Sequence, residues 1–224
     1  MKKLLFSFLL LTFSLVVNAE KFQIEGIWYN LIEKAQQAEV IKAPDGTKYT
    51  GDVVIPEKVT YNELDYNVTR IGDNAFDQCI GLTNIIIPNS VTSIGGYTFY
   101  NCSGLTNITF PNTLKNIGES AFFGCSNLES ISFEGNVKRI GKWAFRGGCI
   151  GLTSVIVPAS VYKINESAFS GCTNLSNAYL YSNLDLNSAN FPETTKLHLT
   201  LNDNDKIDFD ASIANTYADL TYNR

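Results

Sequence analysis

A pattern of 23 residues, once 24, occurs five times in succession and constrains the fold of this 224-residue chain more than any other feature. The copies span residues 68–88, 91–111, 114–134, 137–157 and 161–181. Each copy has a phenylalanine, a cysteine and a leucine in the same order: Phe76, Phe99, Phe122, Phe145, Phe169; Cys79, Cys102, Cys125, Cys149, Cys172; Leu82, Leu105, Leu128, Leu152, Leu175. A repeat of this length typically stacks into a solenoid in which each copy contacts its neighbours. Function is then expected at the positions that vary between copies.

The half of each copy that follows the cysteine predicts a β-strand. In the first copy the apolar residues are Leu82, Ile85 and Ile87. The last two are two residues apart, which is the period of a strand with one buried face. Equivalent strands should pair in parallel about 4.8 Å apart. The other half has the pattern V-x-x-I-G-x-x-A-F, in which Val91 and Ile94 should point inward. We therefore predict a strand-rich α/β-type repeat solenoid with a parallel sheet on its concave face and short turns or helical pieces on its convex face.

Glycine and proline punctuate the copies. Glycine follows the isoleucine in four copies and suggests a turn with positive φ, and the fifth copy has Asn165, the next most tolerant residue type, at that position. Pro88, Pro111 and Pro158 should mark strand ends because proline lacks the N–H that a ladder needs.

The motif I-G-x-x-A-F-x-x-C-x-x-L-T-x-I-x-I-P resembles the BspA-like leucine-rich repeat family over residues 53–181. This range includes a degenerate first strand at Val54–Pro56. The resemblance implies a leucine-rich repeat stack. It also implies a surface protein of the kind found in anaerobic gut and oral bacteria, whose members mostly serve adhesion or interaction.

The ends of the chain do not carry the repeat. Residues 1–19 combine a charged start with an apolar stretch and a small-residue exit at Ala19, which predicts a secretory signal peptide. The alternative, a membrane anchor, needs about 20 apolar residues, and the stretch is shorter. We expect residues 20–52 to form an N-terminal cap of strands or a hairpin, and 182–224 to form a C-terminal cap in which 196–201 alternates like a strand. The protein should be secreted, periplasmic or on the cell surface, with no transmembrane span after removal of the signal.

The five cysteines share one repeat position beside a phenylalanine, which favours free, buried thiols that pack as small apolar groups. Export permits disulfides, so a bridge between neighbouring copies is the alternative. The chain has one histidine, His198, and no C-x-x-C motif, so we expect no metal site, no cofactor and no catalytic residues. The acidic run 202–208 is interpreted as a solvated turn rather than a calcium loop. The net charge of −5 argues against nucleic acid.

Two sets of varying positions are candidate binding surfaces. The first is the outward side of the predicted strands, which is small, polar and nearly uncharged: Asn84, Ile86, Asn107, Thr109, Ser130, Ser132, Ser154, Ile156, Asn177 and Tyr179. It suits a protein or a glycan, but these residues can equally form side-chain ladders that stabilise the stack.

The second set lies on the predicted convex side, where three successive copies have bulky aromatic residues at positions that other copies fill mostly with small or polar ones. Exposed aromatic residues beside arginine are typical of interaction sites. The alternative is local shielding of the turns, with lysine stems over the rings. The set comprises Tyr97, Tyr100, Phe123, Trp143, Arg139, Lys142 and Arg146.

These patterns predict a non-catalytic binding or adhesion module that recognises a protein or glycan, including one from a host. The alternative is a structural spacer or self-assembly module without a dedicated ligand.

Overall fold

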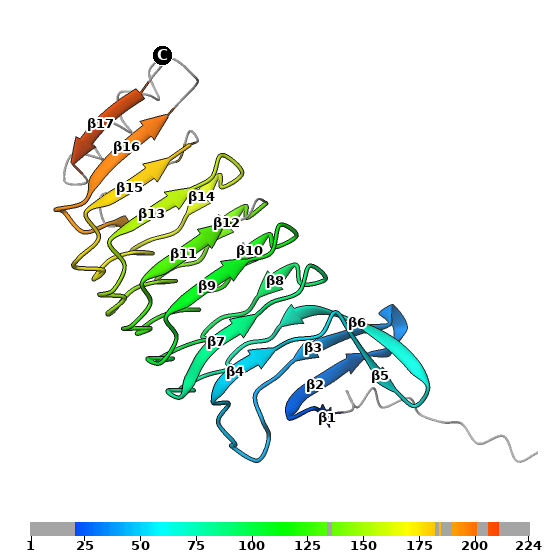
Figure 1. Cartoon of the computed structure of the whole chain (residues 1–224). Coiled ribbons are helices and arrows are strands. Elements are labelled where there is room, and N and C mark those ends of the chain that lie inside the picture. The colour runs from blue at the N-terminus through cyan, green and yellow to red at the C-terminus, as the bar shows by residue number, and fades with distance from the viewer. Residues whose placement is uncertain (1–20, 134–135, 182–183, 185–189, 201–205, 211–224) are drawn as a thin grey trace, which may run out of the picture.

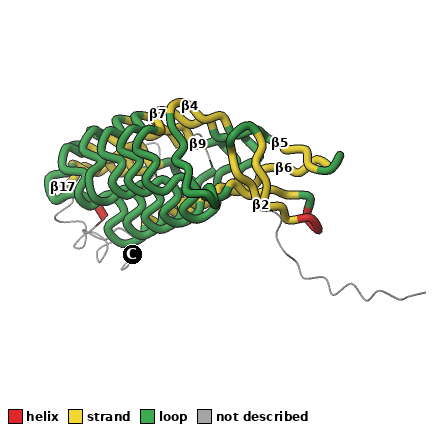
Figure 2. Tube along the Cα trace, turned by 90° about the horizontal axis from the view of Figure 1, so that it is seen from below, coloured by secondary structure: helices red, strands yellow, loops and turns green. Residues whose placement is uncertain are grey.

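The repeats form a β-solenoid with two parallel ladders, one of long and one of short strands (Figures 1 and 2). The computed structural model describes residues 21–133, 136–181, 184, 190–200 and 206–210. The predicted signal peptide therefore lies outside the described residues, as does most of the acidic run at 202–208.

The long-strand face follows the second half of each copy. Its strands are β4 (Gly51–Val54), β7 (Leu82–Ile86), β9 (Asn107–Phe110), β11 (Ser130–Phe133), β13 (Ser154–Val157), β15 (Asn177–Leu180) and β16 (Lys196–Thr200). Strands β4–β7, β9–β11 and β13–β15–β16 pair in parallel. Figure 1 shows these groups side by side. The predicted parallel stacking of strands is confirmed.

The short-strand face consists of two-residue strands: β8 (Ser93–Ile94), β10 (Asn116–Ile117), β12 (Arg139–Ile140) and β14 (Lys163–Ile164). They also pair in parallel, one above the next. The valine and isoleucine of each V-x-x-I pattern point inward, as predicted; Val91 and Ile94 are buried.

The first half of each copy was predicted to contain short turns or helical pieces; it contains turns, and the helical alternative is not supported. The described part of the chain contains no α-helix. The reason is visible in the hydrogen bonds: the N–H groups of Tyr97, Phe99 and Asn101 donate to carbonyls one copy further on, at 2.7–2.8 Å. A helix would use these N–H groups within its own turn. At least two positions per copy also have positive φ, which a right-handed helix excludes; at Tyr97 and Asn101 φ is +54° and +56°.

The repeat glycines do not have the positive φ that the sequence suggested. Gly118 has ordinary φ, but a Cβ there would overlap the backbone of Gly95 in the preceding copy. Glycine is required because neighbouring coils approach closely. The positive φ falls two residues later, at Asn74, Tyr97, Ser120, Trp143 and Ser167. Asn165 also lacks positive φ, and its Nδ2 donates to the Ile140 carbonyl at 2.7 Å.

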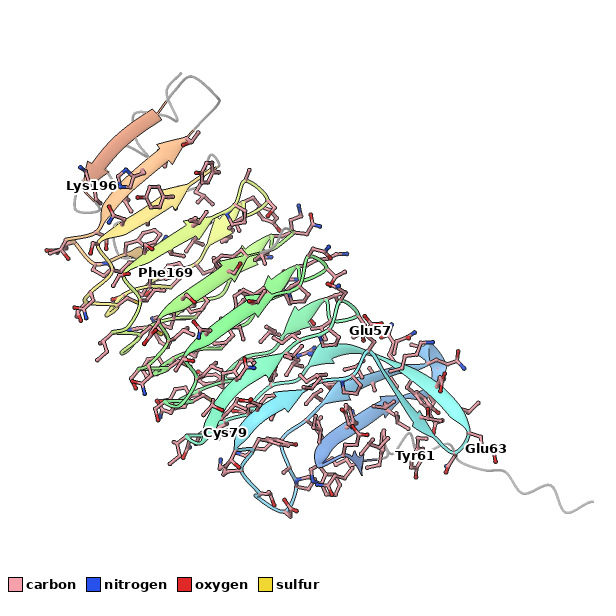
Figure 3. All side chains as sticks on the ribbon, viewed as in Figure 1. Glu57, Tyr61, Glu63, Cys79, Phe169 and Lys196 are labelled. Atoms are coloured by element: carbon pink, nitrogen blue, oxygen red, sulfur yellow. The ribbon has the colours of Figure 1, made fainter. Side chains whose placement is uncertain are left out.

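The core lies between the two ladders and is a column of stacked rings. Phe76, Phe99, Phe122, Phe145 and Phe169 are fully buried, and successive ring centroids lie 4.9–5.2 Å apart. Phe169 and Cys79 are labelled in Figure 3. Phe191, outside the five copies, continues the column at 5.1 Å. Burying each ring stabilises the fold by roughly 1.5–3 kcal/mol.

The N-terminal strands extend the ladder of short strands. β1 (Lys21–Ile24) and β2 (Ile27–Ile32) form a hairpin, followed by the 3-10 turn η1 (Glu33–Ala35) and β3 (Gln37–Val40). β3 pairs in parallel with β6 (Leu64–Ile71), which also pairs with β5 (Lys58–Tyr61) and β8. Residues 21–32 thus form two strands rather than one, because Glu25 and Gly26 turn the chain with positive φ.

At the C-terminal end β16 pairs in parallel with β15, and β17 (Lys206–Asp210) returns antiparallel to it. The strand predicted over 196–201 is thus present as Lys196–Thr200. The antiparallel strand ends the run of parallel pairs.

Candidate binding surfaces

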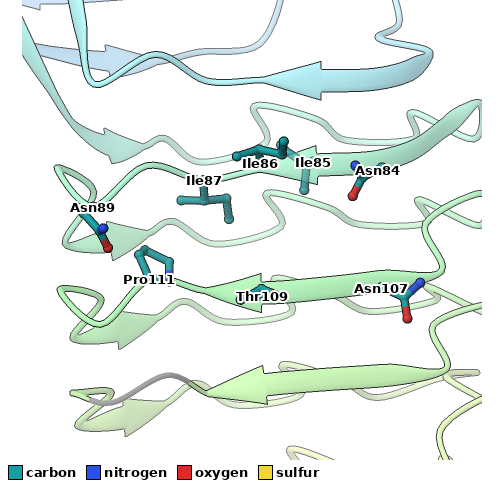
Figure 4. A pocket seen from close by; sticks show the side chains of 8 residues that line it. All are labelled: Asn84, Ile85, Ile86, Ile87, Asn89, Asn107, Thr109 and Pro111. Carbon is teal, nitrogen blue, oxygen red and sulfur yellow. The ribbon is translucent and has the colours of Figure 1, made fainter.

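The long-strand face presents the first candidate set to solvent. Ile86 and Ile156 are 53% and 58% exposed, an unusual position for isoleucine on a sheet. Between β7 and β9 the surface has a hollow with a volume of about 260 Å³ (Figure 4). Asn84, Asn107 and Thr109 supply polar groups to this hollow.

Parts of this face are side-chain ladders. Ser130 Oγ donates to Asn107 Oδ1 at 2.6 Å. Further along, His198 Nε2 lies 2.9 Å from Asn177 Oδ1, and its ring stacks on Tyr179 with centroids 4.5 Å apart. The only histidine thus packs against two residues of the first candidate set. The period-two alternation of 196–200 was the sequence signal for that placement.

Three of the four aromatic residues of the second set form a contiguous group in the turns between the short and long strands. Tyr97 and Tyr100 lie 5.7 Å apart, and Tyr100 stacks on Phe123 at 5.0 Å with 14° between the planes. A Cβ on Gly147 would meet the Phe123 ring at 2.6 Å, so glycine leaves room for the ring. Tyr97 is 38% exposed, while Tyr100 and Phe123 are half-buried. The three rings form one strip along the solenoid.

Trp143 contacts cations. Lys142 Nζ lies 4.3 Å from the centre of the Trp143 ring, and Arg146 Cζ lies 5.4 Å from it, within the range of cation–π contacts. Lys142 also pairs with Glu166 at 2.9 Å. The Trp143 Nε1 is buried and has no hydrogen-bond partner in the described structure. At Trp143 these contacts fit the alternative in which cationic side chains shield the ring from solvent. They do not apply to the strip formed by Tyr97, Tyr100 and Phe123.

Arg139 lies apart from the aromatic strip. It belongs to β12 on the short-strand face, where it is exposed and registers with Lys163 of β14. Lys115 and Lys138 lie on the same face, each one residue before a short strand. The sequence signal for this face was the pair of middle positions in V-x-x-I, which include a basic residue in four of the five copies.

The cysteines form a ladder of free, buried thiols. Cys102, Cys125 and Cys172 donate from Sγ to the phenylalanine carbonyl of the preceding copy at 3.0, 3.1 and 3.2 Å. Burial raises the pKa of Cys102 to about 12. The neutral thiol is a poor nucleophile, so this ladder is suited to packing. Within the described ranges no three metal-ligating side chains gather.

The comparisons with known proteins agree with this geometry. A family model described as BspA type leucine rich repeat region matches residues 56–176 and 105–207, with six copies. No curated protein matches the chain significantly. The described part of the chain has no helix that is long and apolar enough to cross a membrane.

Solved structures share the fold. A leucine-rich repeat protein from Bacteroides ovatus is 27% identical with a TM-score of 0.62, over 80% of this chain and 53% of that one. The leucine rich repeat protein of T. pallidum is 25% identical with a TM-score of 0.64, over 80% of this chain and 81% of that one. A leucine rich cell surface protein from Faecalibacterium prausnitzii is 24% identical with a TM-score of 0.53, over 81% and 51%. The chain thus spans about half the length of the first and third.

Proposed function

The chain belongs to the BspA-type leucine-rich repeat family, and from this premise we propose that it is a non-catalytic binding module. It would be exported and would recognise a protein or glycan through the solenoid surface. The residues that every copy shares are buried in the core, as Phe99 and Leu105 are. The residues that differ between copies remain on the outside.

The observation that carries this proposal is the strip Tyr97–Tyr100–Phe123. Its rings contact one another across two copies and leave part of their surface in water. Solvent-accessible aromatic groups on a rigid scaffold bind at low ordering cost. The repeat backbone supplies that rigidity, because each coil is hydrogen-bonded to the next.

Export is supported by the charged start and apolar stretch of residues 1–19. Absence of catalysis is supported by the packing of His198 against Asn177 and Tyr179, and by the buried thiols.

The test is a binding screen of the full chain against immobilised matrix proteins and glycans, repeated with Y97A/Y100A/F123A, which removes the three rings of the strip. We expect the captured ligand to bind this variant at least about tenfold more weakly, because removing clustered aromatic residues costs 1–2 kcal/mol or more. The matched control I32A/L64A/I80A removes three other exposed apolar side chains. Circular dichroism verifies the fold of both variants.

Unchanged affinity in the folded aromatic variant would refute the role of the strip. If no ligand binds while the protein associates with itself as concentration rises, the structural spacer or self-assembly module is the better account.

A further inference from the structure

The short-strand face carries a row of positive charge. In each V-x-x-I pattern the valine and isoleucine are buried, as Val137 and Ile140 are, and the two residues between them face outward. From the second to the fifth copy these outward residues include four cations and no carboxylate. We call Lys115, Lys138, Arg139 and Lys163 the basic row.

The cations of the basic row lie on neighbouring rungs of one ladder. Arg139 and Lys163 are partners in the register of β12 and β14. The Lys138 N–H donates to the Lys115 carbonyl at 2.8 Å, which places these two residues on adjacent coils. Rungs of a sheet lie about 4.8 Å apart, and like charges directly opposite destabilise it. A bound anion would relieve this repulsion.

No carboxylate in the described part of the chain lies within 4.0 Å of a basic-row cation. Arg70, at the equivalent position in the first copy, differs: it pairs with Glu39 and Asp73, both at 3.0 Å. The chain carries a net charge of −5, so the basic row is a local concentration of charge opposite to that of the whole.

A depression lined by polar side chains lies beside the basic row; we call it the short-strand hollow. It has a volume of about 410 Å³ and is lined by Thr92, Asn112, Thr113, Lys115, Asn136 and Lys138. Its floor is held in place, since Asn136 Nδ2 donates to the Asn112 carbonyl and Thr113 Oγ1 to the Val91 carbonyl, both at 2.9 Å. Beyond Lys138 on the next coil, Tyr162 is 58% exposed.

We propose that the short-strand face binds a linear acidic polysaccharide, whose carboxylate or sulfate groups contact the basic row and whose hydroxyls contact the amides and hydroxyls of the short-strand hollow. This inference rests on the proposed binding function and assigns it a ligand class and a second surface. A chain-like anion fits because the cations follow the solenoid axis from β10 to β14 (Figure 1).

Two other polyanions fit less well. Single-stranded nucleic acid is usually held by several aromatic stacking platforms beside the cations. Among the outward V-x-x-I residues of copies two to five, Tyr162 is the single aromatic residue. An anionic membrane surface favours apolar side chains that insert beside the cations, whereas the short-strand hollow is lined by threonine, asparagine and lysine.

The test measures binding of the full chain to heparin, which is sulfated, to polygalacturonate, which is carboxylated, and to neutral dextran, at physiological ionic strength. The variant is K115Q/K138Q/R139Q/K163Q. The matched control, K21Q/K34Q/K58Q/K196Q, removes the same charge from four other exposed lysines. We expect one or both acidic polymers to bind, the variant to lose about thirtyfold or more in affinity, and the control to lose about threefold or less. The tighter polymer identifies the preferred anion.

Failure of both acidic polymers to bind would overturn the inference, as would equal losses in variant and control. Single-stranded DNA or anionic vesicles that bind as tightly as heparin, with the same sensitivity to the variant, would replace the polysaccharide with another polyanion. If circular dichroism shows that the fourfold variant does not fold, the double variant R139Q/K163Q provides the same comparison. If neither acidic polymer binds but a ligand is captured through the aromatic strip, only this inference is removed. If neither surface binds a ligand, the proposed function is removed as well.

Discussion

Cys102 shows how a single side chain is fixed by the stack. It is fully buried, and its Sγ donates to the Phe76 carbonyl at 3.0 Å. Burial is the main reason that its pKa rises from an ordinary 9.0 to about 12, since the interior disfavours the thiolate. The position common to all five cysteines predicted this burial.

This pKa shift makes stability depend on alkaline pH. The folded state holds the Cys102 proton more tightly than the unfolded state, so its contribution is complete below pH 9 and is lost as the pH rises toward 12. The free energy of unfolding should therefore fall in this window, by at most about 1.4 kcal/mol per pH unit from this residue. Denaturant unfolding at several pH values measures the slope.

Cys102→Ala is the control for that slope. It should lower stability at every pH, because it removes buried atoms, but its stability should fall less steeply above pH 9 than that of the parent protein. Equal slopes would show that other groups cause the alkaline loss.

At the scale of the repeat, the strands were predictable and the turns were not. Leu82, Ile85 and Ile87 specify a strand through their own spacing, independently of neighbouring copies. The turn around Tyr97 depends on hydrogen bonds to the next copy, which a pattern within one copy does not reveal. The same holds for Gly118: the sequence showed that glycine was needed, but the cause is the backbone of Gly95.

The candidate surfaces show the same division. The outward side of the long strands followed directly from alternation, and Ile86 and Ile156 are exposed as expected. The relation between Arg139 and Trp143, four residues apart, did not follow, because a short strand ends between them and a turn begins. The contacts of Trp143 with Lys142 and Arg146 depend on that turn as well.

A glycine pair tests the close approach of neighbouring coils. Gly118→Ala should lower the free energy of unfolding by about 2 kcal/mol or more, because the added Cβ overlaps the backbone of Gly95. Gly96→Ala should change it by less than about 1 kcal/mol, because the Cβ there meets its nearest atom, the Glu119 carbonyl oxygen, at 3.4 Å and φ is ordinary. Urea unfolding of both variants measures the two changes in the free energy of unfolding. Similar losses of stability in the two variants would mean that neighbouring coils are not packed this closely.

At the scale of the whole molecule, one ring column joins both ends of the array. It runs from Tyr49, whose ring lies 4.8 Å from Phe76, to Phe191 beside Phe169. In a repeat array each copy is stabilised by its neighbours, so the outward residues are free to differ between copies. The aromatic strip and the basic row are two such departures, on the turns and on the short-strand face.

The central claim is that ligand contacts the outward residues that differ between copies. Side-chain footprinting of the full chain, with and without the tightest ligand from the binding screen, tests it most directly. The account predicts that Tyr97, Tyr100 and Phe123 become protected, while Ile32 and Leu64, exposed near the N-terminal hairpin, react as before. Protection at Ile32 and Leu64 with none at the aromatic strip would contradict it.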